Sequence, residues 1–340
     1  MQVAVGGGDA KTQRHWRVLR NALLSKSRDV TTDTTDSSLA TEFFPVFASR
    51  RVQNDATLHH PAADNFEWVV HDLAMPRAAT PGKSVIKQVL VHEKQKHQKL
   101  SLVELFSHKV NQGVDNTGNI RTWPSEPVLL SYLLKTRQCQ VLAEAKKARI
   151  NCCELGSGMA GVSSLGLLAH YGEYLDRLLI TDGNPLCVEN LRLCLDENQS
   201  RGVFATTTPP HVKTDLLRWD RSATFDTHLR HQFDLLVASD CLFFEEFHVD
   251  LAHTIKQLLR PDTGRCFLMQ PSRNGSMERF CAIAEQQFGL HVLISRDYDD
   301  AIAQQHTEYL CTRADYVADV HFPVLLTVRA PSMPPDLSAL

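Results

Sequence analysis

The stretch that most constrains the fold of this chain is 150–161, in which a short apolar run leads into a glycine-rich turn. The run ends at Glu154, and Gly156, Ser157 and Gly158 follow it. A segment with the apolar periodicity of a helix then extends to residue 171. A strand, a glycine turn and a helix in this order are typical of the first crossover of an open α/β sheet.

The glycines and the helix that follows them both favour a ligand at this turn. Glycine adopts positive φ without steric cost, and the missing Cβ lets a ligand lie against the backbone. The first turn of a helix carries unpaired N–H groups and the positive end of the helix dipole. We therefore expect an anionic group, or the carboxylate of a cofactor, at the N-terminus of this helix.

Strand and helix patterns continue to alternate after the turn. Asn184 followed by Pro185 predicts the start of a helix. A unit of strand and helix spans about 25 to 30 residues, which argues for a parallel sheet, and one of the last two strands is expected to run antiparallel because no comparable helix joins them. The predicted strands are 178–181, a segment near 212, 233–238, 265–269, 291–295 and 322–328, and the further helices are 128–134, a segment from 185, 246–260 and 277–288.

The first third of the chain is less regular. We interpret residues 1–109 as a partly disordered N-terminal accessory region, with a short helix over 14–26, a strand within 43–52 and a hairpin that pairs 66–73 with 84–91. Residues 110–330 form the α/β domain in this interpretation, and 331–340 form a flexible tail.

Charge and cysteine usage narrow the class of protein. The net charge of −3 gives no support for a nucleic-acid partner. Residues 1–100 carry +4 and the remainder −7, so the basic first third either meets an acidic partner or is a solvated arm. The nine cysteines are scattered without a C-x-x-C pair, which favours reduced core cysteines over a metal site. We expect a monomeric cytoplasmic or also nuclear protein, without a membrane-spanning segment.

Carboxylates stand at the ends of four predicted strands. They are Glu154, Asp182, Asp215 and Asp240, and Trp219 follows the third of them closely. Ligands of open α/β sheets bind beyond the carboxyl ends of the strands, so the set predicts a cofactor site on one rim of the sheet.

The chemistry of the turn distinguishes two cofactors. Residues 156–161 match G-x-G-x-x-G, the fingerprint of dinucleotide sites, in which Asp182 would hold a ribose. An ionised Glu154 beside a pyrophosphate would repel it, whereas it would attract the ammonium and sulfonium of S-adenosylmethionine. That cofactor also has a diol for Asp182 and an adenine for Trp219. A nicotinamide-dependent oxidoreductase remains the alternative, and a binding module without activity is a third possibility.

Five stretches of the chain carry a resemblance to a known family. They are 115–126, 153–159, 179–184, 217–220 and 239–243, and they are similar to the class I S-adenosylmethionine-dependent methyltransferases that modify lysine in non-histone proteins. The resemblance extends over about residues 110 to 330. It implies a Rossmann-like seven-stranded sheet with helices on both faces, S-adenosylmethionine as the cofactor and no metal.

The resemblance also implies roles for single residues. Asp240 and Phe243 match the acid-x-x-aromatic motif of the family, which holds the target lysine next to the sulfonium. The substrate is expected to be an acidic protein, calmodulin in the first place or another non-histone protein. The residues expected to surround the cofactor are Trp123, Glu154, Gly156, Ser157, Gly158, Asp182, Trp219 and Ser239.

Overall fold

The structure is a computed structural model that describes residues 43–52, 57–62, 65–75, 85–95, 121–204, 206–222 and 224–332. The helix predicted over 14–26, residues 115–120 of the family resemblance and residues 333–340 of the predicted tail lie outside the described residues.

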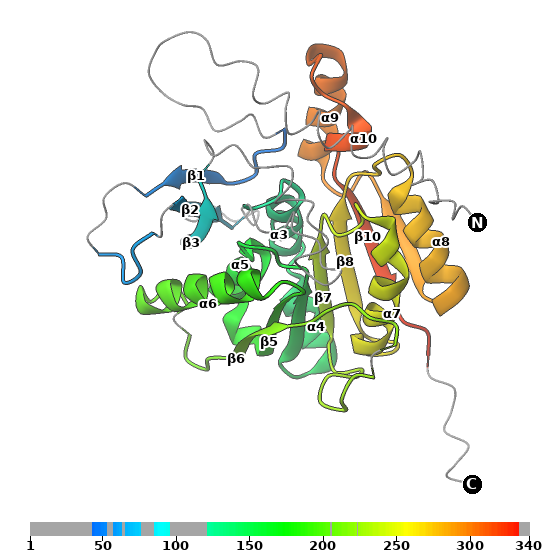
Figure 1. Cartoon of the computed structure of the whole chain (residues 1–340), viewed down its shortest axis with the longest axis horizontal. Coiled ribbons are helices and arrows are strands. Elements are labelled where there is room, and N and C mark those ends of the chain that lie inside the picture. Colours follow the sequence, from blue (N-terminus) through cyan, green and yellow to red (C-terminus); the bar gives the residue numbers. More distant parts are fainter. Residues whose placement is uncertain are drawn as a thin grey trace, which may run out of the picture. The chain divides into compact units, whose positions relative to one another are not determined.

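A seven-stranded sheet forms the centre of the described chain (Figure 1), in the order β6-β5-β4-β7-β8-β10-β9. Neighbouring strands from β6 to β8 pair in parallel, and β10 runs antiparallel to both β8 and β9. The predicted parallel sheet with one antiparallel strand near its end is therefore confirmed. The strands are β4 (Ile150–Leu155), β5 (Leu175–Asp182), β6 (His211–Leu216), β7 (Leu235–Ser239), β8 (Arg265–Gln270), β9 (His291–Ser295) and β10 (Val324–Arg329).

Helices cover both faces of this sheet. In β4, β7 and β8 nearly every residue is buried, and because successive side chains of a strand point to opposite faces, both faces must be covered. The helices are α3 (Ser125–Lys135), α4 (Gln138–Lys146), α5 (Val162–Tyr171), α6 (Pro185–Ser200), α7 (His248–Leu258), α8 (Ser276–Phe288), α9 (Asp300–Thr312) and α10 (Ala318–His321), with short 3₁₀ turns at Gly172–Tyr174 and Glu245–Phe247.

Local signals placed most of these elements correctly. The Asn184 side chain accepts a hydrogen bond of 3.0 Å from the N–H of Leu186, and Pro185 occupies the first helical position, so the predicted start of α6 is confirmed. We did not predict α4, α9 or α10. The physical reason is that they bury few residues, only Cys139 and Ala143 in α4 and Ile302 in α9, so they carry little helical periodicity.

A second, three-stranded antiparallel sheet comes from the first third of the chain. It contains β1 (Ala48–Arg51), β2 (Phe66–Ala74) and β3 (Ile86–Lys94), in that order. The pairing of β2 with β3 confirms the predicted hairpin. The strand expected within 43–52 is limited to the four residues of β1.

Buried amides of α6 hold β3 in place. The Asn198 side chain accepts a hydrogen bond from the N–H of Leu90 at 2.8 Å and donates one to the C=O of Leu90 at 2.6 Å. It thus pairs with both backbone groups of Leu90, as the backbone of a neighbouring strand would. Two turns earlier on the same face of α6, Asn190 donates to the C=O of His92 at 2.8 Å. Because α6 buries polar residues on this face, a search for apolar periodicity does not detect the contact.

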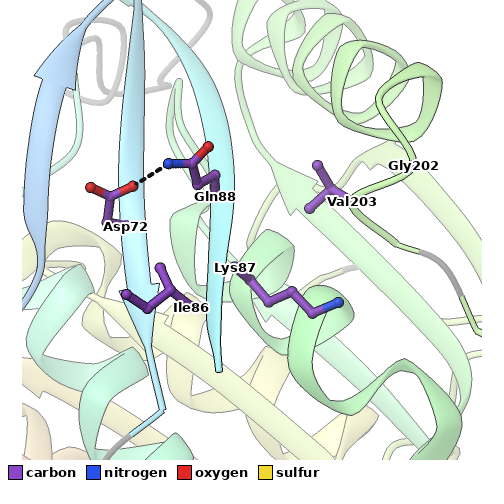
Figure 2. A pocket seen from close by; sticks show the side chains of 6 residues that line it. All are labelled: Asp72, Ile86, Lys87, Gln88, Gly202 and Val203. Atoms are coloured by element: carbon purple, nitrogen blue, oxygen red, sulfur yellow. Dashed lines mark hydrogen bonds between the residues drawn. The ribbon is translucent and has the colours of Figure 1, made fainter. Parts of the chain in front are cut away.

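An open cleft of about 480 Å³ lies between the small sheet and the turn after α6 (Figure 2). Its lining includes Asp72 and Gln88, which are joined by a hydrogen bond of 2.9 Å. Ile86, Lys87, Gly202 and Val203 complete it. None of the predicted site residues lines this cleft, so it is separate from the site described below.

Among the described residues, no helix is both long and apolar enough to cross a membrane.

We expect Asn198→Ala to lower the free energy of unfolding by about 2–4 kcal/mol, because the buried N–H and C=O of Leu90 lose their partners. Urea denaturation measures this change. Gln199→Ala, at the exposed neighbouring position, is the matched control and should change stability by less than about 0.5 kcal/mol. Equal effects of the two substitutions would contradict the role of Asn198.

Candidate functional site

The glycine turn after β4 has no room for a side chain at Gly156. Gly156 and Gly158 have φ of 66° and 61°, in the region that favours glycine. A Cβ on Gly156 would lie 2.9 Å from the Sγ of Cys241 and 3.0 Å from the ring of Trp219. The Trp219 ring therefore lies directly against the turn, although it is 63 residues away in sequence.

Asp182 joins the end of β5 to the same turn. One of its carboxylate oxygens accepts the N–H of Gly158 at 2.9 Å, and the other accepts the N–H of Asn184 at 2.8 Å. Burial raises the pKa of Asp182, and these two hydrogen bonds oppose that shift. The N–H of Leu217 donates to the C=O of Asp182 at 3.0 Å, and this bond holds the segment that contains Trp219 beside the end of β5.

Glu154 is 1% exposed and lies beneath the turn. Its carboxylate accepts the N–H of Ser164 at 3.1 Å. Burial raises the pKa of Glu154 to about 7, the nearby Asp182 adds to this shift, and the hydrogen bond from the N–H of Ser164 opposes it.

A second buried carboxylate, Glu126 in α3, faces the same helix N-terminus. It accepts the N–H of Ser163 at 3.1 Å. Burial, followed by the charge of Glu154, raises the pKa of Glu126 well above its ordinary range. We did not predict this residue as part of the site. Its position within 115–126, one of the stretches that resemble the family, was the available signal.

These contacts correct one expectation. We expected unpaired N–H groups at the start of α5 that would receive an anionic ligand. Ser163 and Ser164 instead donate their N–H groups to Glu126 and Glu154. The protein itself supplies the negative charge at this helix end, so this expectation is wrong for both residues.

The end of β7 continues the site. Asp240 has φ of 52°, which is uncommon for a residue with a side chain. Its carboxylate accepts the N–H of Ser125 at 3.2 Å and forms an ion pair of 2.7 Å with the Nη2 of Arg273. The guanidinium of Arg273 also lies 5.3 Å from the ring centroid of Phe243. The two residues predicted to hold a lysine therefore share a cationic partner.

Arg273 was missed in the sequence. The turn from Pro271 to Gly275 after β8 gave no signal for a functional role, because Asp240, the partner of Arg273, follows the neighbouring strand β7. Trp123 and Ser239, two further predicted residues, are half-buried. Trp123 lies two residues before Ser125 in the chain, and the C=O of Ser239 accepts a hydrogen bond from Cys241.

Cys241 links the glycine turn to the end of β7. Its thiol lies 3.5 Å from the C=O of Leu155 and 3.2 Å from that of Ser239. Burial raises the pKa of this thiol well above its ordinary range, and the charges of Asp182, Asp240 and Glu154 contribute. The charges of three strand-end carboxylates thus act on one side chain.

Asp215, the fourth strand-end acid, is not bonded within this cluster. Its side chain is 43% exposed and pairs with Lys213 on its own strand at 2.6 Å. No group of three or more metal-ligating side chains occurs within the part of the chain that the structure describes.

The raised pKa of Glu154 predicts a pH effect on stability. Its value in the fold lies above the ordinary 4.5, so the fold binds a proton more tightly than the unfolded chain does. This contribution is complete below about pH 4.5 and is lost as the pH rises to about 7. We expect a decrease of roughly 1–3 kcal/mol in this window, and Glu154→Gln should remove that part of the slope in denaturation series.

The matched control for this series is Asp196→Asn, on the exposed face of α6, which should keep the slope of the native chain. An unchanged slope in Glu154→Gln would contradict the assignment to Glu154.

Comparisons with known proteins identify the family of this chain. The family described as lysine methyltransferase matches residues 106–287. Calmodulin-lysine N-methyltransferase of Arabidopsis thaliana is 30% identical over 294 residues, which cover 86% of each chain. Protein-lysine N-methyltransferase EFM3 of Saccharomyces cerevisiae is 24% identical over 192 residues, 54% of each chain.

Similarity to solved structures is weaker. The CMeT domain of the citrinin polyketide synthase is 14% identical, with a TM-score of 0.37, and the match covers 62% of this chain and 54% of that one. This similarity carries no argument about function. The family match and the Arabidopsis relative are sufficient: the chain belongs to the lysine methyltransferase family, it is a protein-lysine methyltransferase, and its cofactor is S-adenosylmethionine.

Proposed function

We propose that this chain methylates a lysine of calmodulin, and that Asp240 and Phe243 hold the target side chain beside a cofactor bound at the glycine turn. Two facts support this substrate. The Arabidopsis relative that is similar over 86% of both chains is named for calmodulin. Residues 1–100 carry a charge of +4, which suits an acidic protein such as calmodulin.

The residues at the turn fit S-adenosylmethionine by their chemistry. Asp182 is a buried carboxylate held at the end of β5 by the N–H groups of Gly158 and Asn184, and a carboxylate is an acceptor suited to the hydroxyls of a ribose. Gly156 presents bare backbone beside the Trp219 ring, a flat apolar surface suited to an adenine. Buried Glu154 acts on a cationic cofactor through its charge and by holding the turn to α5.

One observation carries the placement of the lysine. Cys241 contacts the C=O groups of both Leu155 and Ser239, so the glycine turn and Asp240 are one side chain apart. A lysine held by Asp240 is then next to a cofactor on the turn.

When bound, S-adenosylmethionine supplies a methyl group on a positively charged sulfur. The protein's contribution is to position the amine. Asp240 accepts a hydrogen bond from the amine and so orients its nitrogen, and correct orientation of reacting groups is a large part of such rate enhancements. Phe243 is half-buried, and its ring stabilises the cationic product by about 0.5–2 kcal/mol.

The direct test is incubation with isotopically labelled cofactor and calmodulin, followed by mass spectrometry of the modified residue. We expect label on one lysine, and Asp240→Asn should lower the rate by about 100-fold or more, because the amine loses its anionic acceptor. Cofactor affinity, measured by calorimetry, should stay the same in this variant.

Two results would contradict the proposal in different ways. Label that appears only on other proteins of a cell extract would exclude calmodulin and retain the activity. Full activity of Asp240→Asn would exclude Asp240 from the lysine site. Unlabelled calmodulin in which all lysines are replaced by arginine, incubated with the same labelled cofactor, is the control for adventitious modification.

We expect Asp182→Ala to weaken cofactor binding by about 10- to 100-fold, because a charge-assisted hydrogen bond to the ribose is lost. Calorimetric titration with S-adenosylhomocysteine, the product form of the cofactor, measures this. The matched control is Asp215→Ala, at the end of the adjacent strand, which should bind normally. Unchanged affinity in Asp182→Ala would place the ribose elsewhere.

A further inference from the structure

Arg273 is held against Asp240 from two sides. Its backbone N–H donates to the C=O of Asp319 at 2.8 Å, and the N–H of Asn274 donates to the carboxylate of Asp319 at 2.7 Å. Its guanidinium bonds to Asp240 at 2.7 Å. The Arg273 side chain is 15% exposed and that of Asp240 is 6% exposed, so the pair is largely removed from water.

The backbone around this pair is in an unfavourable conformation. Asp240, Arg273 and Asn274 have φ of 52°, 52° and 57°, and Gly275 follows at 77°. For residues with side chains this conformation costs roughly 1–2 kcal/mol each, and it persists only where surrounding contacts enforce it. The contacts from α10 and from the end of β7 are these enforcing contacts.

A lone carboxylate would be a poor partner for a lysine that must react. Free lysine has a pKa near 10.4, and a neighbouring negative charge raises it further by favouring the ammonium form. An ammonium has no lone pair to attack with. Asp240 by itself would therefore orient the substrate and hold it in its unreactive form.

We propose that Arg273 is a positioning residue whose guanidinium neutralises Asp240, so that the site receives the target lysine as a neutral amine. This inference rests on the proposed role of Asp240 and Phe243 as the lysine site. The cationic guanidinium near the amine also disfavours the ammonium by like-charge repulsion.

The ammonium of the target lysine gives a proton to solvent. The freed lone pair of its nitrogen then forms the new nitrogen–carbon bond, while the carbon–sulfur bond breaks with its electron pair left on sulfur.

Other titratable or charged groups lie around the pair of Asp240 and Arg273. They are Cys241 beside Asp240, Asp319 from α10, Glu126 from α3, Glu154 and Asp182 from β4 and β5, and the ion pair of Glu245 with Arg279.

The test is the pH profile of the single-turnover rate with saturating cofactor and protein substrate. We expect Arg273→Gln to shift the rising limb of the rate to higher pH by about one unit or more, so that the rate at pH 7 falls about tenfold or more and recovers at high pH. KM should stay the same or fall, because Asp240 then binds the ammonium more tightly. Arg273→Lys, which keeps the positive charge, should return the rising limb of the pH profile to its position in the native chain.

The matched control is Arg260→Gln, which removes an arginine ion-paired at 2.8 Å to Asp234, just before the start of β7 and thus at the other end of the strand from Asp240, and it should leave the profile unchanged. If Arg273→Gln does not fold, as judged by thermal unfolding, Asp319→Ala releases the turn while Arg273 stays, and it should shift the limb in the same direction by less.

A rate lowered equally at every pH would reduce Arg273 to a structural residue and overturn the inference. A higher rate with a lower KM would also overturn it, because Arg273 would then be a competitor of the substrate lysine. Both results differ from failure of the proposed function, in which Asp240→Asn itself keeps full activity.

Discussion

The N-terminus of α5 meets two buried carboxylates, and the rest of the site depends on this contact. Glu126 comes from α3 and Glu154 from β4, and they accept neighbouring N–H groups of one helical turn. The positive end of the helix dipole offsets part of the cost of burying them. Burial raises the pKa of both carboxylates, and the charge of Glu154 adds to the shift of Glu126 while that of Asp182 adds to the shift of Glu154, so the pair retains a proton more readily than exposed carboxylates do. The contact attaches α3, β4 and α5 to one another, and the glycine turn between β4 and α5 therefore has fixed ends.

The three carboxylates at the strand ends are chemically different although the sequence presents them alike. Glu154 is buried on a helix N-terminus, Asp182 is bonded to two backbone N–H groups, and Asp240 is paired with Arg273. Each partner sets how much negative charge the carboxylate presents. A lysine methyltransferase needs this difference, because it binds a cationic cofactor next to an amine that must be uncharged when it reacts.

The sequence predicted those features whose signals are local. The strand and glycine turn at 150–161, the cap at Asn184 and the hairpin of β2 and β3 are each contained in a short window of residues. The antiparallel final strand followed from the missing crossover helix.

Features that depend on packing between distant segments were not predictable in the same way. Glu126 has the pattern of an ordinary first-turn acid until α5 is placed against it. Arg273 reaches Asp240 only because β7 and β8 are neighbours in the sheet. Asn198 belongs to a polar face of α6 that a search for apolar periodicity passes over. In each case the decisive partner is more than 30 residues away in sequence.

Helix α6 is attached near both of its ends, and this has a mechanical consequence. The helix begins three residues after Asp182, and in its last turn Asn198 forms two hydrogen bonds with the backbone of Leu90. Because α6 is rigid and is held at both ends, a displacement of the β3 backbone would tilt the helix and with it the segment that follows Asp182. Substitutions that alter the path of β3 are therefore expected to change the backbone geometry near Asp182 as well.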